Sequence, residues 1–488
     1  MINKITSGFI RILCLVFLVS IIGLSIIGIF PQGVKFGIIV LIGLLFFVFL
    51  FLVAVEKLSL PKYKLFWLSL IILGIIIRIA YAFTVNADII SDQEHCLNAA
   101  QQVARGNYTW ATSDPYFERW AYQIPFVLYE GFVLRIFGTV RALYVLNGVF
   151  SVITCFLIYA IVKKIHNKNV ALITMAVFSC FPLFVFSISR LYNQIIAGVF
   201  MLLAIYFFVS VCKRPYYNEP RNDFFRVLLL CALTGLFLGI SNLFRTEAII
   251  GLLAVECWFI YSFIVNIKKE KLSVLIFRLI LCMLITYVVY KIVNVGVGLT
   301  IVYSGISPNG IKNGCIYWFI VCGLTPESFG AYSTKYAYIT DYKDSTQQFE
   351  VFKSIIKEIF SNQNICDICT FFAKKEYYMW GEISYYSASY APHIVYTLLN
   401  NFSHCIYILI IALSVVGLNK KRYNTVVVFL SILFLGFFFA FVIKEISSTY
   451  RYSTILIFIL LSSGGINYLV EGNRTICSKI PILRRNCV

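Results

Sequence analysis

Acidic residues gather in one window of this chain, from Asn86 to Pro125. The sequence has 22 Asp and Glu among 488 residues, and five of them fall in this window: Asp88, Asp92, Glu94, Asp114 and Glu118. The window is also the first long interruption in an almost continuous run of apolar residues. Ionisable groups at the edge of a membrane segment are costly and are commonly functional. We therefore expect some of these carboxylates to be used by the protein.

Basic residues occupy short turns between later apolar segments, where they would normally be rare. These are Arg190, Arg245 in the run FRTEAII, and Arg451 in STYRY, with Lys374 in a longer insertion. Cations that converge near a carboxylate cluster predict a site for an anionic ligand, and phosphate is the natural candidate. For any one of these residues, the alternative is a side chain that only snorkels to the membrane interface.

The elements that must position these charges are membrane helices. The chain is 60% hydrophobic, 17% aromatic and only 13% charged, whereas soluble proteins average about 25% charged residues. Each crossing needs about 20 apolar residues, so the composition predicts an all-α polytopic membrane protein with about a dozen spans. The net charge of +19 fits basic cytoplasmic loops better than a nucleic-acid partner.

Apolar segments predict the spans. They lie near 8–30, 34–55, 66–85, 139–162, 168–188, 191–211, 225–243, 247–266, 272–293, 403–418, 424–443 and 450–470. The apolar segment 122–137 is short and contains Glu130, so we expect a helix that lies at the outer interface. With this count, every short basic link falls on one side, which the positive-inside rule makes cytoplasmic. Both termini are then cytoplasmic, and the acidic window is outside.

This topology divides the chain into three parts. Residues 1–293 form a transmembrane bundle whose outer loop at 86–138 would carry the catalytic residues, and residues 294–402 form an extracytoplasmic insertion. Residues 403–488 supply the last transmembrane helices and a cytoplasmic tail. Within the insertion, the spacing of apolar residues predicts a helix over 346–361. Cys366 and Cys369 form a CxxC pair, but no second pair or nearby His completes a metal set.

The acidic window resembles the first extracytoplasmic loop of the GT-C glycosyltransferases, in particular the group of the protein O-mannosyltransferases and the aminoarabinose transferase of lipid A. The matching residues are Asp92, Ala99, Ala100, Gly106, Asn107 and Tyr108, followed by Pro125, Tyr129 and Phe137–Gly138. The run from Asn242 to Ile250 resembles the Arg-x-Glu turn of these enzymes, and the run from Lys444 to Leu461 resembles the Arg-Tyr start of their last span. The Lys-Pro-Pro or His-Pro-Pro that often follows the loop is missing, and Arg119 and Gln123 stand in its place.

The resemblance implies a GT-C-like bundle with juxtamembrane helices in the first outer loop. It implies transfer of a monosaccharide from a polyprenyl-phosphate donor to an extracytoplasmic glycan, lipid or protein, with inversion at the anomeric carbon. By resemblance, Asp92 is the general base; an alternative role is the N-cap of its helix, which Ser91 could fill instead. Arg245 is the first choice for the donor phosphate, and Glu247 would orient it. Further phosphate candidates are Arg451, Arg190, Arg119 and Lys374, with Gln123 as a further substrate contact.

We expect no cofactor and no metal. Glu94 and His95 could assist or hold a divalent cation, but two adjacent residues do not make a metal site. Two other functions stay open: a flippase or exporter of cell-surface glycans, and a polymerase of the O-antigen type. A transporter should have polar residues at mid-membrane, whereas here the charges crowd at one face. The Ile- and Lys-rich composition indicates a bacterial plasma membrane.

Overall fold

The computed structural model describes residues 2–30, 34–58, 63–214, 221–267, 271–312, 314–342, 344–361, 363–381, 393–419 and 424–479. Parts of the basic links and of the tail, at 215–220, 268–270, 420–423 and 480–488, lie outside these ranges. The regular secondary structure of the described residues is entirely helical. Eleven helices are long and apolar enough to cross a membrane, or twelve with one bent pair. The predicted all-α polytopic membrane fold is confirmed.

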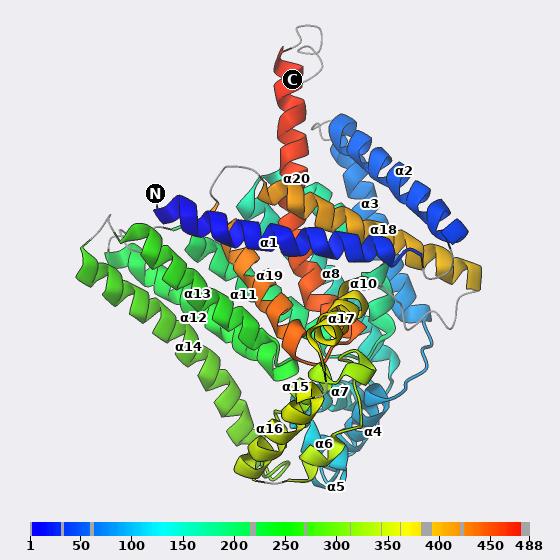
Figure 1. The fold of residues 1–488 in the computed structure, drawn as a ribbon, viewed down its shortest axis with the longest axis vertical. Coiled ribbons are helices and arrows are strands. Elements are labelled where there is room, and N and C mark those ends of the chain that lie inside the picture. The colour runs from blue at the N-terminus through cyan, green and yellow to red at the C-terminus, as the bar shows by residue number, and fades with distance from the viewer. Residues whose placement is uncertain are drawn as a thin grey trace.

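The long helices form the body of the molecule (Figure 1). They are α1 (Ile2–Ile27), α2 (Val34–Leu58), α3 (Lys64–Thr84), α8 (Arg141–Ile165), α11 (Gln194–Cys212), α12 (Arg221–Phe244), α13 (Ala248–Asn266), α14 (Leu272–Tyr303), α18 (His393–Leu418), α19 (Thr425–Ile443) and α20 (Arg451–Lys479). The helix α14 continues past the predicted end at 293. The helix α12 packs between α11 and α14, and α18 packs along α20. A Cβ on Gly417 would lie 2.7 Å from the backbone nitrogen of Gly465, so small residues permit the close crossing of α18 and α20.

The segment 168–188 is broken, whereas the sequence predicted one continuous span. It forms α9 (Lys168–Ser179) and α10 (Pro182–Phe186), and the chain bends by 59° between them. Pro182 has no backbone N–H to continue the helix. The fully buried Arg78 of α3 supplies the missing donors: its guanidinium donates to the carbonyl oxygens of Phe178 at 2.9 Å and Ser179 at 2.7 Å. The break is thus stabilised by a cation from a neighbouring helix.

We expect Arg78→Met to destabilise the protein by about 1–3 kcal/mol, because the buried Ser179 carbonyl loses its donor, whereas the Phe178 carbonyl still accepts from the Phe181 N–H at 3.1 Å. The measurement is the heating temperature at which the detergent-solubilised protein stops eluting as a monodisperse peak. Arg226→Met is the matched control, since its side chain on α12 is 70% exposed. Equal heat resistance of both variants would contradict the role given to Arg78.

Shorter elements gather at one end of the bundle, at the bottom of Figure 1, away from the C-terminal end of α20. They include α4 (Asp92–Ala104), α5 (Trp110–Ser113), α6 (Pro115–Arg119), η2 (Ala121–Gln123), α7 (Ile124–Phe137), α15 (Trp318–Leu324) and α16 (Ser345–Ser361). The other short elements are η3 (Ser187–Ser189), η4 (Pro326–Ser328), η5 (Ala337–Asp341), α17 (Ile365–Glu376), η6 (Tyr377–Gly381) and η8 (Ser448–Tyr450).

Two of the predicted helices are found at this end. The predicted interfacial helix is α7, which packs on α4 and is not among the helices long enough to span a membrane. The predicted helix at 346–361 is α16, which buries Ile355 and Ile359.

Candidate functional site

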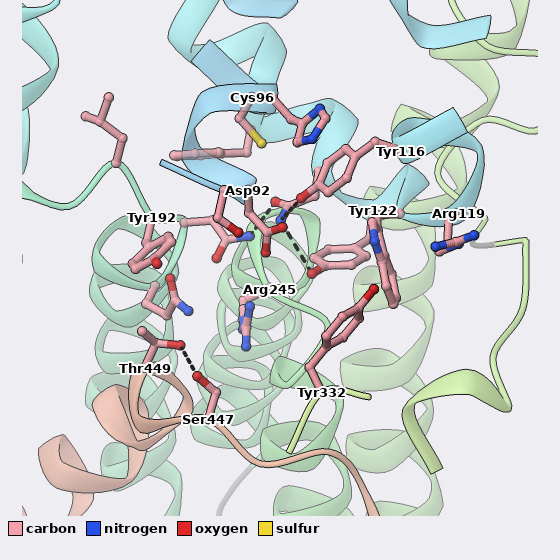
Figure 2. Close-up of a pocket in the computed structure, with 18 of the residues that line it drawn as sticks. Asp92, Cys96, Tyr116, Arg119, Tyr122, Tyr192, Arg245, Tyr332, Ser447 and Thr449 are labelled. Carbon is pink, nitrogen blue, oxygen red and sulfur yellow. Dashed lines mark hydrogen bonds between the residues drawn. The ribbon is translucent and has the colours of Figure 1, made fainter. Parts of the chain in front are cut away.

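A cavity of about 690 Å³ lies where these short elements meet the ends of the long helices. Its walls come from α4, α6 and η2, from the segment that precedes α11, and from the links α12–α13 and α19–α20. Four of the residues singled out from the sequence line it: Asp92, Arg119, Gln123 and Arg245. Asp92 and Arg245 reach into the same space in Figure 2. The tertiary structure therefore brings together residues from the acidic window and from a turn about 150 positions later in the chain.

Asp92 is the first residue of α4 and is exposed to the cavity. Ser91 occupies the N-cap position, but its side chain makes no capping hydrogen bond, and its φ is 57°. A left-handed backbone is uncommon for a residue other than glycine and is found preferentially at functional sites. Partial burial raises the pKa of the Asp92 carboxyl above its usual range, although a hydrogen bond from Tyr116 and the charges of His95 and Arg245 oppose the rise.

Gln123 organises the wall beside Asp92. Its Nε2 lies 3.4 Å from the hydroxyl oxygens of both Tyr116 and Tyr122, and its Oε1 accepts a hydrogen bond of 2.9 Å from Asn193. The amide is thus occupied by protein groups, and its side chain fixes two tyrosines of the cavity. Burial raises the pKa of both tyrosines, so both stay protonated hydroxyls, and that of Tyr116 donates its proton to Asp92.

Arg245 belongs to a buried charge cluster. Its Nη2 lies 3.4 Å from Oε1 of Glu247, and the same oxygen is 2.8 Å from Nζ of Lys444. The guanidinium carbon also lies 4.3 Å from the ring centroid of Tyr450. Burial opposes the charged form of Glu247, but Lys444 and Arg245 outweigh it and lower the pKa of this carboxyl. Glu247 thus holds two cations together, and Arg245 Nε has no hydrogen-bond partner among the described residues.

Glu445 is a further carboxyl in the cavity wall, beside Asp92 and Asp114, and it was not among the residues singled out as site candidates. The Tyr450 hydroxyl donates to Oε1 of Glu445 at 3.3 Å. The backbone N–H of Glu445 donates to the carbonyl oxygen of Phe319 at 2.7 Å. Burial raises the pKa of Glu445 to about 7, although Lys444 opposes the rise. The sequence signal was its position in the same short link as Lys444, directly before the last span.

Lys375 fixes this link to the insertion and was also missed, because the sequence favoured its neighbour Lys374. The side chain of Lys375 is fully buried, and its Nζ donates to the carbonyl oxygens of Gly323 at 2.5 Å, Val442 at 2.9 Å and Lys444 at 3.0 Å. These carbonyls end α15 and α19, where a cation is favourable. Burial lowers the pKa of Lys375 to about 7. The ammonium group thus holds the residues around Glu445 in place.

The other candidates lie outside the first cavity. The side chain of Glu94 is exposed and does not line it, and neither do Arg190 and Lys374. Arg451 is buried and lines a second, neighbouring cavity. Lys374 Nζ lies 5.2 Å from the ring centroid of Phe329.

The imidazole of His95 is held by neighbouring side chains in the first cavity. Among the described residues, no three His, Cys, Asp or Glu side chains lie close enough together to hold a metal ion. His95 pairs instead with Asp114, at 3.4 Å, and stacks on Tyr116. Asp114 also caps α6 through a hydrogen bond of 2.9 Å from the backbone N–H of Tyr116.

Solved structures of an archaeal oligosaccharyltransferase share this fold. The structure of the Archaeoglobus fulgidus enzyme tethered to an acceptor peptide aligns with a TM-score of 0.51 at 10% sequence identity, over 87% of this chain and 51% of that one. The structure of AglB from the same organism, with an inhibitory peptide and a dolichol-phosphate, aligns with a TM-score of 0.48 at 12% identity, over 86% and 52%.

The chain spans about half the length of these proteins. No protein-family model matches the sequence, and no curated protein matches it. The class that the fold defines is an all-α polytopic membrane protein whose helix bundle resembles that of the archaeal oligosaccharyltransferase.

Proposed function

We propose that this protein is a membrane glycosyltransferase that moves a monosaccharide from a polyprenyl-phosphate donor to an extracytoplasmic acceptor. The observation that carries this proposal is the cavity in which the Asp92 carboxylate and the Arg245 guanidinium meet. A base and an anion-binding cation in one cavity are the two groups that displacement of a phosphate leaving group requires. The GT-C-like fold supports the same chemistry.

The reaction is a single displacement. The acceptor hydroxyl oxygen forms a bond to the anomeric carbon, and the bond from that carbon to the phosphate oxygen breaks. The electron pair of the broken bond leaves with the polyprenyl phosphate, while the acceptor proton passes to Asp92. The attack comes from the face opposite to the leaving group, so the configuration of the anomeric carbon is inverted.

The reaction needs positive charge of the protein beside the phosphate leaving group. The donor is a phosphodiester with one negative charge, and the departing phosphomonoester gains a second. Arg245 lines the cavity, and Lys444 shares Glu247 with it. Preorganised cations of this kind stabilise developing charge without having to reorganise during the reaction. Glu247 keeps both cations in position and does not itself line the cavity.

The proposal includes a location. We place the cavity on the extracytoplasmic side of a bacterial plasma membrane, with both termini in the cytoplasm and the prenyl chain of the donor in the bilayer. The basic links in the sequence support this orientation. Labelling of single cysteines with a membrane-impermeant reagent tests it: residue 105, at the end of α4, should react from outside, and residue 167, between α8 and α9, should not.

The activity is tested with purified protein in proteoliposomes, a panel of radiolabelled polyprenyl-phosphate monosaccharides, and an envelope extract as acceptor. The expected result is the loss of label from one donor, with appearance of polyprenyl phosphate and of labelled acceptor. Movement of an intact donor across the bilayer without cleavage would instead identify a flippase. Consumption of lipid-diphosphate oligosaccharides only would identify a polymerase.

The pKa of Glu445 predicts that anion binding depends on pH. The carboxyl is neutral below about 7 and negative above it, and it faces Lys444, Tyr450, Arg245 and Asp92. A phosphate at Arg245 should therefore bind best with Glu445 protonated. We expect the affinity for a short polyprenyl methyl phosphate, a diester whose single charge does not change near neutral pH, to fall about tenfold as pH rises through 7, because nearby charges interact by a few kcal/mol. The Glu445→Gln variant should bind with a flat pH profile; an unchanged profile would contradict this linkage.

A further inference from the structure

A second cavity, of about 470 Å³, lies beside the first. The two cavities share three lining residues: Tyr332, Glu445 and Ser447. The second cavity is formed by the insertion, through residues 328–332 and Tyr378, and by the link that leads into α20. Its volume lies within the range of about 300–1,000 Å³ that is usual for small-molecule sites. No residue role assigned above accounts for it.

The lining of the second cavity combines aromatic faces with hydroxyl groups. Phe329 and Tyr378 stack with ring centroids 5.2 Å apart and an interplanar angle of 21°. The link contributes hydroxyl groups and Arg451, which is buried. The buried Ser448 Oγ has no hydrogen-bond partner among the described residues. The wall thus offers aromatic surface together with hydroxyl, guanidinium and carboxyl groups.

The position of Phe329 carries backbone strain. Its φ is 52°, and Ser91 and Phe329 are the two residues other than glycine with positive φ in the described part of the chain. Each of them lines one of the two cavities. For a bulky side chain this conformation is a genuine outlier that its surroundings must impose. The next residue, Gly330, packs against the buried Lys375 side chain. The Gly330 carbonyl oxygen accepts a hydrogen bond from the backbone N–H of Ile446 at 2.9 Å.

We propose that the second cavity binds a saccharide, which places the acceptor of the proposed transfer reaction among the glycans. A pyranose ring has an apolar C–H face and a rim of hydroxyl groups. The face matches the ring of Tyr378, which is 46% exposed and is backed by Phe329, because aromatic faces carry partial negative charge that attracts C–H groups. The rim matches the serine hydroxyls, Arg451 and Glu445. A hydroxyl of the bound sugar can pass Tyr332 and Glu445 and enter the first cavity.

Other acceptor classes fit the second cavity less well. A peptide in extended conformation gains affinity by pairing its backbone with a sheet edge, and the described residues form no strand. A lipid chain is favoured by a wholly apolar wall, whereas serines and two charged residues line this one. That the bound saccharide is the acceptor rests on the proposed function, whereas the binding of a saccharide in the second cavity does not.

The experiment measures binding without any donor. Purified full-length protein is applied to an array of fluorescently labelled oligosaccharides, with peptides and prenyl lipids as parallel probes. Wild-type protein and Asp92→Asn should bind the same saccharides. Tyr378→Ala should weaken that binding about tenfold, because stacking on an aromatic ring contributes of the order of one tenfold step in affinity. Tyr303→Ala is the control, since Tyr303 is 85% exposed, and elution profiles confirm that each variant is folded.

The outcomes separate this inference from the proposed function. Failure of every saccharide to bind, or equal binding by Tyr378→Ala and wild type, overturns the saccharide site. Binding of peptides or prenyl lipids that Tyr378→Ala abolishes also overturns it. If saccharide binding depends on Tyr378 but the protein cleaves no lipid-linked donor, the saccharide site is supported and the proposed transferase function is contradicted.

Discussion

Replacing Asp92 by Asn should reduce sugar transfer by about 10²–10⁴-fold, the usual contribution of a positioned general base. Asparagine has nearly the same shape and cannot accept the proton, so binding of the donor should change little. The measurement is the rate of transfer from a labelled donor at saturating concentration, together with the affinity for polyprenyl phosphate. Glu94→Gln is the matched control: it removes a carboxylate two residues away whose side chain is exposed and does not line the cavity.

The pH dependence gives this prediction a second readout. The pKa of Asp92 is raised, and only the ionised form accepts a proton. The wild-type rate should therefore be highest above this raised pKa and should fall as the pH drops through it. The residual rate of Asp92→Asn should lack this acidic limb. Full transfer by the variant, or an unchanged acidic limb, would remove Asp92 as the base.

Replacing Arg245 by Met should have the second largest effect, a loss of about 10²–10³-fold in kcat, because one preorganised donor to developing charge contributes that much. The side chain is mostly buried but lines the cavity, so its guanidinium can donate charge-assisted hydrogen bonds to a phosphate there. Arg245→Lys should recover only part of the rate, since an ammonium group cannot reproduce the planar guanidinium fork.

The Glu247→Gln variant tests whether Glu247 acts by orienting Arg245 and Lys444 and not by contacting the donor. Glu247 bridges Arg245 and Lys444 through Oε1, so its loss should lower kcat less than Arg245→Met while raising the KM for the donor. Arg105→Met is the control, because Arg105 is exposed in the same outer loop and does not line the cavity. A normal kcat for Arg245→Met would move the phosphate role to another cation, such as Arg119 or Arg451.

The sequence by itself determined the class of protein and most of its spans. Long apolar segments must become helices in a bilayer, because every backbone polar group there has to be paired internally. The acidic window and the Arg-x-Glu turn could also be found from the sequence, because charged residues at the ends of apolar segments are conspicuous there. Asp92 and Arg245 stood out in this way, whereas Arg119 and Gln123 were selected through the resemblance to the GT-C glycosyltransferases, and the fold brings these four to one cavity.

Only the tertiary structure decided which charges share a cavity, because that depends on how distant helices pack and rotate. Lys374 and Lys375 are equivalent in sequence, yet α17 buries Lys375 against three carbonyls and leaves Lys374 exposed. Glu445 enters the cavity wall because its link is held by those contacts. The break at Pro182 was likewise hidden, since the donors that stabilise it belong to Arg78, about a hundred residues earlier.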